Sequence, residues 1–241
     1  MTPPYRLLVP KLSLLIISLC ALINATAQTV DERFPVINNA GAIHDMAVSG
    51  STLFVAGSFT SLGPPTGSFA STNRTTAAAD LSWPKVEGDV HVVVPDGSGG
   101  WYIGGSISNI DGVIRNGAAH IKSDKTLDLA WDPDISGGAG IVYSIVLAPQ
   151  GIILGGKFTT VGGTARNNIA MVDYLDGRAR TWDANATGGT EVVNELVLSG
   201  NNTVYVGGNF TTIGGTARSN LAEVDLGTAS ATVGRQIRME P

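Results

Sequence analysis

The chain has 241 residues, of which 43% are hydrophobic and only 15% are charged, and it contains 31 glycines. This supply of apolar residues is enough for the core of one domain of ordinary size, while the abundant Gly, Ser, Thr and Asn favour short strands joined by tight turns and disfavour long helices. The formal net charge of −5 argues against nucleic acid or an anionic membrane as the main partner.

The N-terminus has the pattern of a secretory signal, predicted to cover residues 1–27. Arg6 and Lys11 supply the positive flank, Leu12–Ile23 is the apolar run, and Ala25-Thr26-Ala27 is a small-x-small cleavage site. The run is short for a membrane span and no second apolar stretch follows it, so no span is expected after signal removal. We therefore expect a secreted or cell-surface protein, with an uncleaved anchor as the alternative.

Cys20 is the only cysteine, and it lies inside the predicted signal. Leu19 stands before it where a lipoprotein signal has a small residue, which argues against a lipid anchor. The mature chain would contain no thiol, which excludes disulfides, thiolate metal sites and cysteine nucleophiles.

An internal repeat begins after the signal and recurs four times. Its anchor is a glycine-rich strand end followed by Ser/Thr, which is a glycine pair in three copies and Ala56-Gly57 in the first, and the last glycine of this strand end falls at Gly57, Gly105, Gly156 and Gly208. A tryptophan lies 26 residues after this glycine in three copies, at Trp83, Trp131 and Trp182. An arginine lies 10 residues after it in three copies, at Arg115, Arg166 and Arg218.

The third copy shows the predicted strands most clearly. They are Val142–Leu147, Ile152–Phe158, Asn168–Asp173 and a short outer strand Arg178–Trp182. A period of about 50 residues with four strands per unit is typical of β-propeller blades. We predict an all-β fold, a β-propeller of about four four-stranded blades, with a solenoid as the alternative.

The predicted domain organisation follows from the repeat. The propeller region spans residues 28–233, and an irregular polar tail covers 234–241. The four units are approximately 35–83, 84–131, 132–182 and 183–233.

The repeated residues have structural explanations. Paired glycines at a strand end allow close backbone approach or a bulge. Each tryptophan offers a large apolar plate to the neighbouring unit. The arginines are expected to bond carbonyls or a carboxylate between units, and a ligand-binding arginine cluster is the alternative.

The segment Thr126–Pro133, followed by Val142 to Thr159, resembles the delta-60 repeat, and the likeness recurs over most of residues 29–226. The glycine pair is also shared with kelch repeats, although the tryptophan spacing differs from theirs. The resemblance implies a β-propeller in a secreted or cell-surface bacterial protein. It implies no activity, because the family has none firmly attached.

The sequence does not decide whether the four units close into a ring. Val30–Phe34 resembles the strand that ends in each tryptophan, so this segment could complete the last unit and cover its edge. Against this, Gly234 stands where the next tryptophan is due, and the pattern fades after Leu226. A complete four-unit ring and a fragment of a longer ring remain equal alternatives.

One repeated place carries four different polar residues. Alignment of the units puts His44, His91, Tyr143 and Asn194 at equivalent positions on the innermost strand of each unit. Innermost strands line the channel of a propeller, where ligands often bind. We hypothesise a polar ring for a small ligand or a metal, with packed or solvated channel residues as the alternative.

No catalytic motif accompanies these residues. The Ser-x-Asp-x-Gly-x-Thr-Trp box of sialidases and the Gly-x-Ser-x-Gly elbow are absent, and the aspartates show no calcium-loop spacing. We expect no cofactor and no dedicated metal site, and a non-catalytic binding or adhesion module for an unknown extracellular ligand, either a glycan or a protein. The alternatives are a carbohydrate-active or other enzyme that uses the channel face, and a structural spacer of a larger surface protein.

Overall fold

The computed structural model describes residues 37–38, 41–62, 66–73, 75–76, 78–190 and 192–232, all within one structural unit, Arg33–Pro241. The predicted signal at 1–27, the segment Val30–Phe34 and the tail 234–241 lie outside the described residues. Every regular element among the described residues is a β-strand, so the all-β prediction is confirmed. Within those same ranges, no helix has the length and apolarity needed to cross a membrane.

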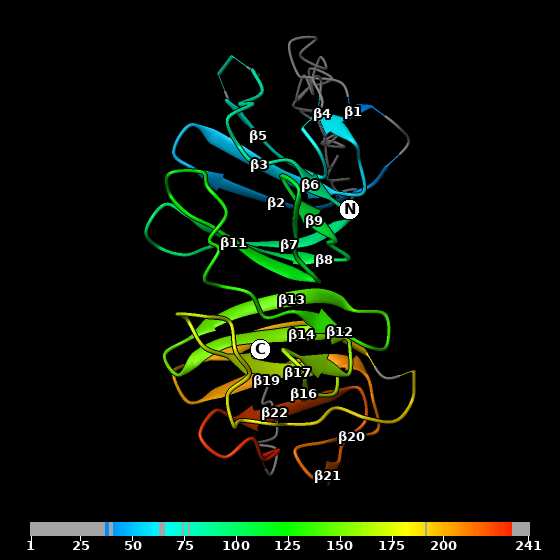
Figure 1. Cartoon of the computed structure of the whole chain (residues 1–241). Helices are drawn as coiled ribbons and strands as arrows, with labels where there is room; N and C mark the ends of the chain where they lie inside the picture. The colour runs from blue at the N-terminus through cyan, green and yellow to red at the C-terminus, as the bar shows by residue number, and fades with distance from the viewer. Residues whose placement is uncertain are drawn as a thin grey trace, which may run out of the picture. The chain divides into compact units, whose positions relative to one another are not determined.

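Four antiparallel sheets of three strands form the body of the protein, one in each predicted unit (Figure 1). The first sheet contains β2 (Ile43–Ser49), β3 (Thr52–Gly57) and β5 (Phe69–Asn73), and the second contains β7 (Val90–Pro95), β8 (Trp101–Gly105) and β11 (Ala118–Ile121). The third contains β13 (Ile141–Ala148), β14 (Gly151–Lys157) and β17 (Ile169–Val172), and the fourth contains β18 (Val192–Ser199), β19 (Thr203–Asn209) and β22 (Leu221–Asp225). The first strand of each sheet, called the inner strand below, lies at the sheet edge beside the middle strand.

The predicted fourth strand of each unit is reduced to a single β-bridge. The bridged pairs are Thr72–Ala79, Ile121–Leu127, Val172–Ala179 and Val224–Ala231. In the third unit the chain leaves the sheet after this bridge because Trp182 turns to the next unit, where its indole N–H donates to the Asp225 carbonyl at 3.0 Å.

Small accessory sheets, which the sequence did not predict, lie at one end of each unit. Their strands are β1 (Ile37–Asn38) with β4 (Ser61–Leu62); β6 (Val86–Glu87) with β9 (Asn109–Ile110) and β10 (Val113–Ile114); β12 (Ile135–Ser136) with β15 (Thr160–Val161) and β16 (Thr164–Ala165); and β20 (Thr212–Ile213) with β21 (Thr216–Ala217). Gly162 and Gly163 turn the β15–β16 hairpin with φ of 54° and 75°, which L side chains rarely adopt. In the third unit, β12, which precedes the inner strand β13, pairs with β15, which follows the middle strand β14.

Successive units pack through their inner strands. β7 contacts β2 and β3, β13 contacts β7 and β8, and β18 contacts β13 and β14. At each contact, one residue at the same repeat position of the inner strand is buried. These residues are Val93 at 6% exposure, Ile145 at 4% and Leu196 at 3%. Each inner strand therefore covers the inner and middle strands of the unit before it.

The first glycine of each pair makes this approach possible. A Cβ at Gly155 would lie 2.7 Å from Val193 Cγ1 and 3.1 Å from Leu196 Cδ1 of the next unit. A Cβ at Gly104 would lie 2.8 Å from Val142 Cγ1 in the same way. A larger residue at either glycine would push the neighbouring inner strand away.

The second glycine of each pair has a different function. A Cβ at Gly57, Gly105, Gly156 or Gly208 would overlap a carbonyl oxygen just before or at the start of the inner strand of the same sheet. At Gly156 this oxygen belongs to Ile141, which pairs with Lys157 beside the glycine. The two glycines thus serve two close approaches, one between units and one within the sheet.

The tryptophans fill the space between consecutive units. Trp131 is fully buried, meets the Tyr102 ring of the second unit at 5.1 Å, and donates its indole N–H to the Asp173 carbonyl of the third unit at 3.0 Å. Trp83 meets the Phe54 ring of the first unit edge-on at 5.1 Å and packs in the same cluster as the second unit's core. Each indole therefore joins two neighbouring sheets.

The repeated arginines close the loop that leads to the next unit. Each guanidinium donates to a carbonyl oxygen 14 residues further along, in the pairs Arg115–Leu129, Arg166–Arg180 and Arg218–Thr232. Arg115 is buried and also forms an ion pair with Asp132 at 3.1 Å. The three carbonyls lie in the same predicted unit as their arginines, so among the described residues the expected bonds between units are formed only by the ion pairs of Arg115 with Asp132 and of Arg166 with Asp183, the latter at 3.7 Å.

The two end units leave outward faces uncovered. Ile43 and Met46 of β2 are 43% and 59% exposed, and Val197 of β18 and Leu221 of β22 are both 54% exposed. The described parts of the first and fourth units therefore do not cover one another, as they would in a closed ring of four.

We expect Gly156→Ala to lower the free energy of unfolding by about 1–3 kcal/mol or more, because the new methyl group overlaps the Ile141 carbonyl within the sheet. Gly227→Ala is the matched control, since Gly227 is exposed and its Cβ would meet only the Asp225 carboxylate at 3.3 Å. Urea unfolding of both variants measures the difference. Equal stability of the two variants would show that the glycine pair is not required by packing.

Candidate functional site

The four residues that the sequence places together all lie on β-bulges. The register of the inner strand against the middle strand shifts once in every unit, between Ile43 and Asp45, Val90 and Val92, Val142 and Ser144, and Val193 and Glu195. The extra residue at each shift is His44, His91, Tyr143 or Asn194. A bulge takes its extra residue out of the hydrogen-bond ladder and redirects the side chain, which is common beside functional sites.

The bulges bring three of these side chains into one row. The His44 and His91 ring centroids lie 4.6 Å apart with a 47° interplanar angle. The His91 and Tyr143 centroids lie 5.1 Å apart at 55°. Asn194 holds the equivalent place on β18, which packs beside β13. We call these four residues the bulge row; its outer members His44 and Asn194 are exposed, and its central members are half-buried.

Burial and the neighbouring His44 keep the His91 side chain uncharged. Burial lowers the pKa of His91, the nearby His44 lowers it further, and Asp89 opposes the shift only in part. At neutral pH the His91 imidazole is therefore uncharged and presents one donor nitrogen and one acceptor nitrogen.

Side chains next to the bulge row hold the inner strands in place. Asp45 Oδ2 accepts a hydrogen bond from the Val93 N–H of the second unit at 2.8 Å. Ser144 Oγ accepts one from the Leu196 N–H of the fourth unit at 3.0 Å. In the first and third units, the residue directly after the bulge thus joins its unit to a neighbouring one, whereas Val92 at this position in the second unit has an apolar side chain.

The bulge row combines aromatic ring faces with hydrogen-bonding groups. Two imidazoles, a phenol and an amide offer ring faces and hydrogen-bonding groups, with no carboxylate among them. Within the described ranges, no group of three or more His, Cys, Asp or Glu side chains is placed to hold a metal ion. Such a surface suits an uncharged polar ligand.

A network around His120 was missed from the sequence. His120 Nδ1 lies 3.0 Å from Asp128 Oδ2, and His120 Nε2 lies 3.1 Å from Asp96 Oδ2. The ring stacks on Tyr102 with centroids 4.3 Å apart and a 20° angle. Asp96 also accepts from the backbone N–H groups of its own turn, so the network fastens the β7–β8 turn to the outer segment of the second unit. The sequence held no signal for it, because His120 has no counterpart histidine in the other units.

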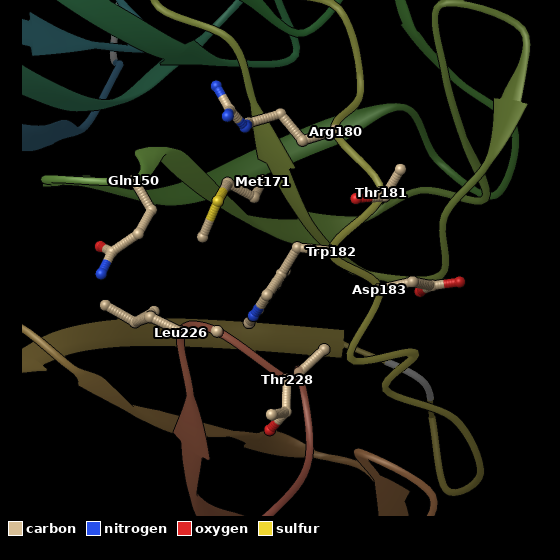
Figure 2. A pocket seen from close by; sticks show the side chains of 10 residues that line it. Gln150, Met171, Arg180, Thr181, Trp182, Asp183, Leu226 and Thr228 are labelled. Atoms are coloured by element: carbon tan, nitrogen blue, oxygen red, sulfur yellow. The ribbon is translucent and has the colours of Figure 1, made fainter.

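A pocket of about 380 Å³ opens between the third and fourth units (Figure 2). Gln150, Met171 and Arg180 of the third unit line it together with Trp182, and Leu226 and Thr228 come from the fourth unit. Trp182 and the Gln150 amide, which donates to the Asn201 carbonyl at 3.1 Å, both join the two units. The pocket is thus lined largely by groups that already hold the scaffold together, which makes it a weaker candidate than the bulge row.

No protein-family model and no curated protein matches the sequence. Among solved structures, the chain is similar to the crystal structure of the computationally designed Ika4 protein, with a TM-score of 0.50 and 12% identity over 81% of this chain and 98% of that one. It is also similar to the computationally designed Ika8 protein, with a TM-score of 0.50 and 13% identity over 85% of this chain and 53% of that one. At these identities the likeness concerns the fold alone.

The His120 network predicts an acid-sensitive contribution to stability. Burial would raise the pKa values of Asp96 and Asp128, but hydrogen bonds, including those from His120, hold both below their usual range. Since lowered carboxyl pKa values stabilise the fold above about pH 4, this stabilisation is lost as the pH falls through the lower folded-state values. We expect His120→Gln to cost about 1–2 kcal/mol at pH 6 and to flatten the loss of stability below pH 4.

Urea unfolding between pH 6 and pH 2.5 measures both effects. His44→Gln is the control, because His44 is exposed and should change the stability by less than about 0.5 kcal/mol. Parallel stability curves for wild type and His120→Gln would contradict the assignment.

Proposed function

We propose that the protein is a secreted or cell-surface β-propeller-type module that binds an extracellular ligand without catalysis, and that the bulge row is its ligand-binding surface. One observation carries the proposal: the same bulge, repeated on four successive inner strands, places His44, His91 and Tyr143 ring beside ring. The predicted N-terminal signal supports the location.

The propeller part of the proposal rests on the units. Each has an antiparallel three-stranded sheet extended by one bridge, which we interpret as a blade with a residual fourth strand. Successive sheets pack face to face with the inner strands next to one another. In a propeller this arrangement puts the bulge row on the wall of the channel.

An uncharged carbohydrate is the ligand class that fits the bulge row best. Half-buried rings offer apolar faces for the C–H surface of a sugar, and the neutral His91 and the Asn194 amide supply both donors and acceptors for hydroxyl groups. A charged ligand would find no compensating charge among these four side chains. Ligand sites commonly combine such an apolar surface with a few polar groups.

We expect the purified protein to bind neutral oligosaccharides on a glycan array, and His91→Ala and Tyr143→Ala each to weaken the binding about 10-fold or more, equivalent to at least ~1.4 kcal/mol. Isothermal titration with the best oligosaccharide measures the loss. Tyr174→Ala is the matched control, because this half-exposed tyrosine contacts the carbonyl of Ala148 at the far end of β13 from Tyr143.

The competing functions give different results in the same experiment. Release of new reducing ends from the bound oligosaccharide would establish an enzyme and overturn the non-catalytic proposal. Unchanged affinity in both row variants would remove the bulge row from the binding site. Binding to no glycan on the array would reject the carbohydrate and favour a protein ligand or a structural spacer.

A further inference from the structure

The uncovered faces of the end units are parts of the same interface that joins the inner units. Met46 occupies the repeat position of Val93, Ile145 and Leu196, all of which are buried against the preceding unit. Leu221, at the start of β22, occupies the position of Phe69, Ala118 and Ile169, and these are fully buried. Met46 and Leu221 are exposed because, among the described residues, no unit packs on the outward face of the first unit or of the fourth.

These two faces are complementary in shape. Inside the protein, Val193 and Leu196 lie over Gly155, and Val142 and Ile145 lie over Gly104. The equivalent glycine of the fourth unit is Gly207, and among the described residues only Glu195 comes within 4 Å of a Cβ built there, at 3.9 Å. The equivalents of Val193 and Leu196 in the first unit are Ile43 and Met46, which are both exposed. The apolar pair at one end therefore fits the open glycine at the other.

A polar contact would accompany the apolar one. Asp45 and Ser144 accept hydrogen bonds from the N–H groups of Val93 and Leu196 in the following unit. Glu195 stands at the same repeat position in the fourth unit and is exposed, and one of its carboxylate oxygens, Oε1, accepts a hydrogen bond from the Ser144 hydroxyl of the third unit at 3.4 Å. The corresponding N–H group in a following unit would be that of Met46, which at present donates to Asp45 of its own strand.

We propose that a second copy of this chain is the partner for both faces: the fourth unit of each copy packs on the first unit of the other. Reciprocal pairing covers all the exposed end-face side chains at once, as closed two-fold assemblies do. The chain matches 98% of the designed Ika4 chain but only 53% of the Ika8 chain, so its fold also occurs as about half of one longer chain. The proposal rests on the repeat interface and not on the ligand of the bulge row.

Light scattering of the protein expressed from the full 241-residue sequence tests the pairing. We expect twice the mass of one chain at micromolar concentration, and we expect Met46→Glu and Val197→Glu each to weaken the pair about 30-fold or more, because each buries a charge at the interface. Leu175→Glu is the matched control, since Leu175 is an exposed apolar residue on a turn of the third unit, away from both faces. It should leave the mass unchanged.

A cross-link tests the predicted register. Met46→Cys combined with Glu195→Cys should give a disulfide-linked pair under mild oxidation, because the equivalent residues inside the protein, Leu196 and Ser144, are joined by a hydrogen bond of 3.0 Å between neighbouring units. Each single variant, in the mature form predicted to lack Cys20, has only one introduced thiol and should run as an unlinked chain on a non-reducing gel.

A single-chain mass at tens of micromolar would overturn the proposal and leave additional units of a longer protein as the occupant of the two faces. Assemblies larger than two copies would overturn the reciprocal closure. A pair that survives both charged variants, or a double cysteine variant that forms no cross-link, would show that the copies join elsewhere.

Discussion

The structure depends on one contact, the packing of each inner strand over the middle strand of the preceding unit. The contact needs a small residue on the middle strand. The size of this residue varies with the size of the side chains that face it from the next unit. Ala56 lies in one buried cluster with the shorter Val90 and Val93, whereas Gly104 and Gly155 face the longer Ile145 and Leu196, each together with a valine. The summed volume at the contact is thereby kept nearly constant, as close-packed interiors require. Tryptophans then fill the wider space further out, and arginines close the connecting loops.

The same contact explains why one repeated position can vary. A bulge residue takes no part in the ladder of its sheet, so the scaffold does not demand a particular side chain there. The residues beside it do carry scaffold bonds, as Asp45 and Ser144 show. The chain places His, His, Tyr and Asn at the unconstrained position, and the spacing of the units brings the three rings within contact. Scaffold and candidate site are thus set by the same repeat but by different residues within it.

Much of the fold was predictable from the sequence because its structural residues repeat in each unit. The glycine pairs, the tryptophans and the arginines recur at set spacings, and the strands predicted for the third unit agree with β13, β14 and β17 to within one or two residues. The accessory sheets were not predictable in this way, since strands of two residues carry no hydrophobic alternation. The outer strand was over-predicted because Trp182 bonds to the next unit and draws the chain out of its sheet. The Asp96–His120–Asp128 network was missed because it occurs once, in one unit, between residues distant in sequence.

The most direct test of this account is the measurement of nuclear Overhauser effects between ring protons in protein labelled at histidine and tyrosine. Stacked inner strands place the His44 and His91 centroids 4.6 Å apart and the His91 and Tyr143 centroids 5.1 Å apart. The account predicts cross-peaks for both neighbouring pairs, and their loss for His91 partners in the His91→Ala variant. Observation of neither cross-peak in the folded protein would contradict the stacking of the units and, with it, both the candidate site and the proposed pairing of copies.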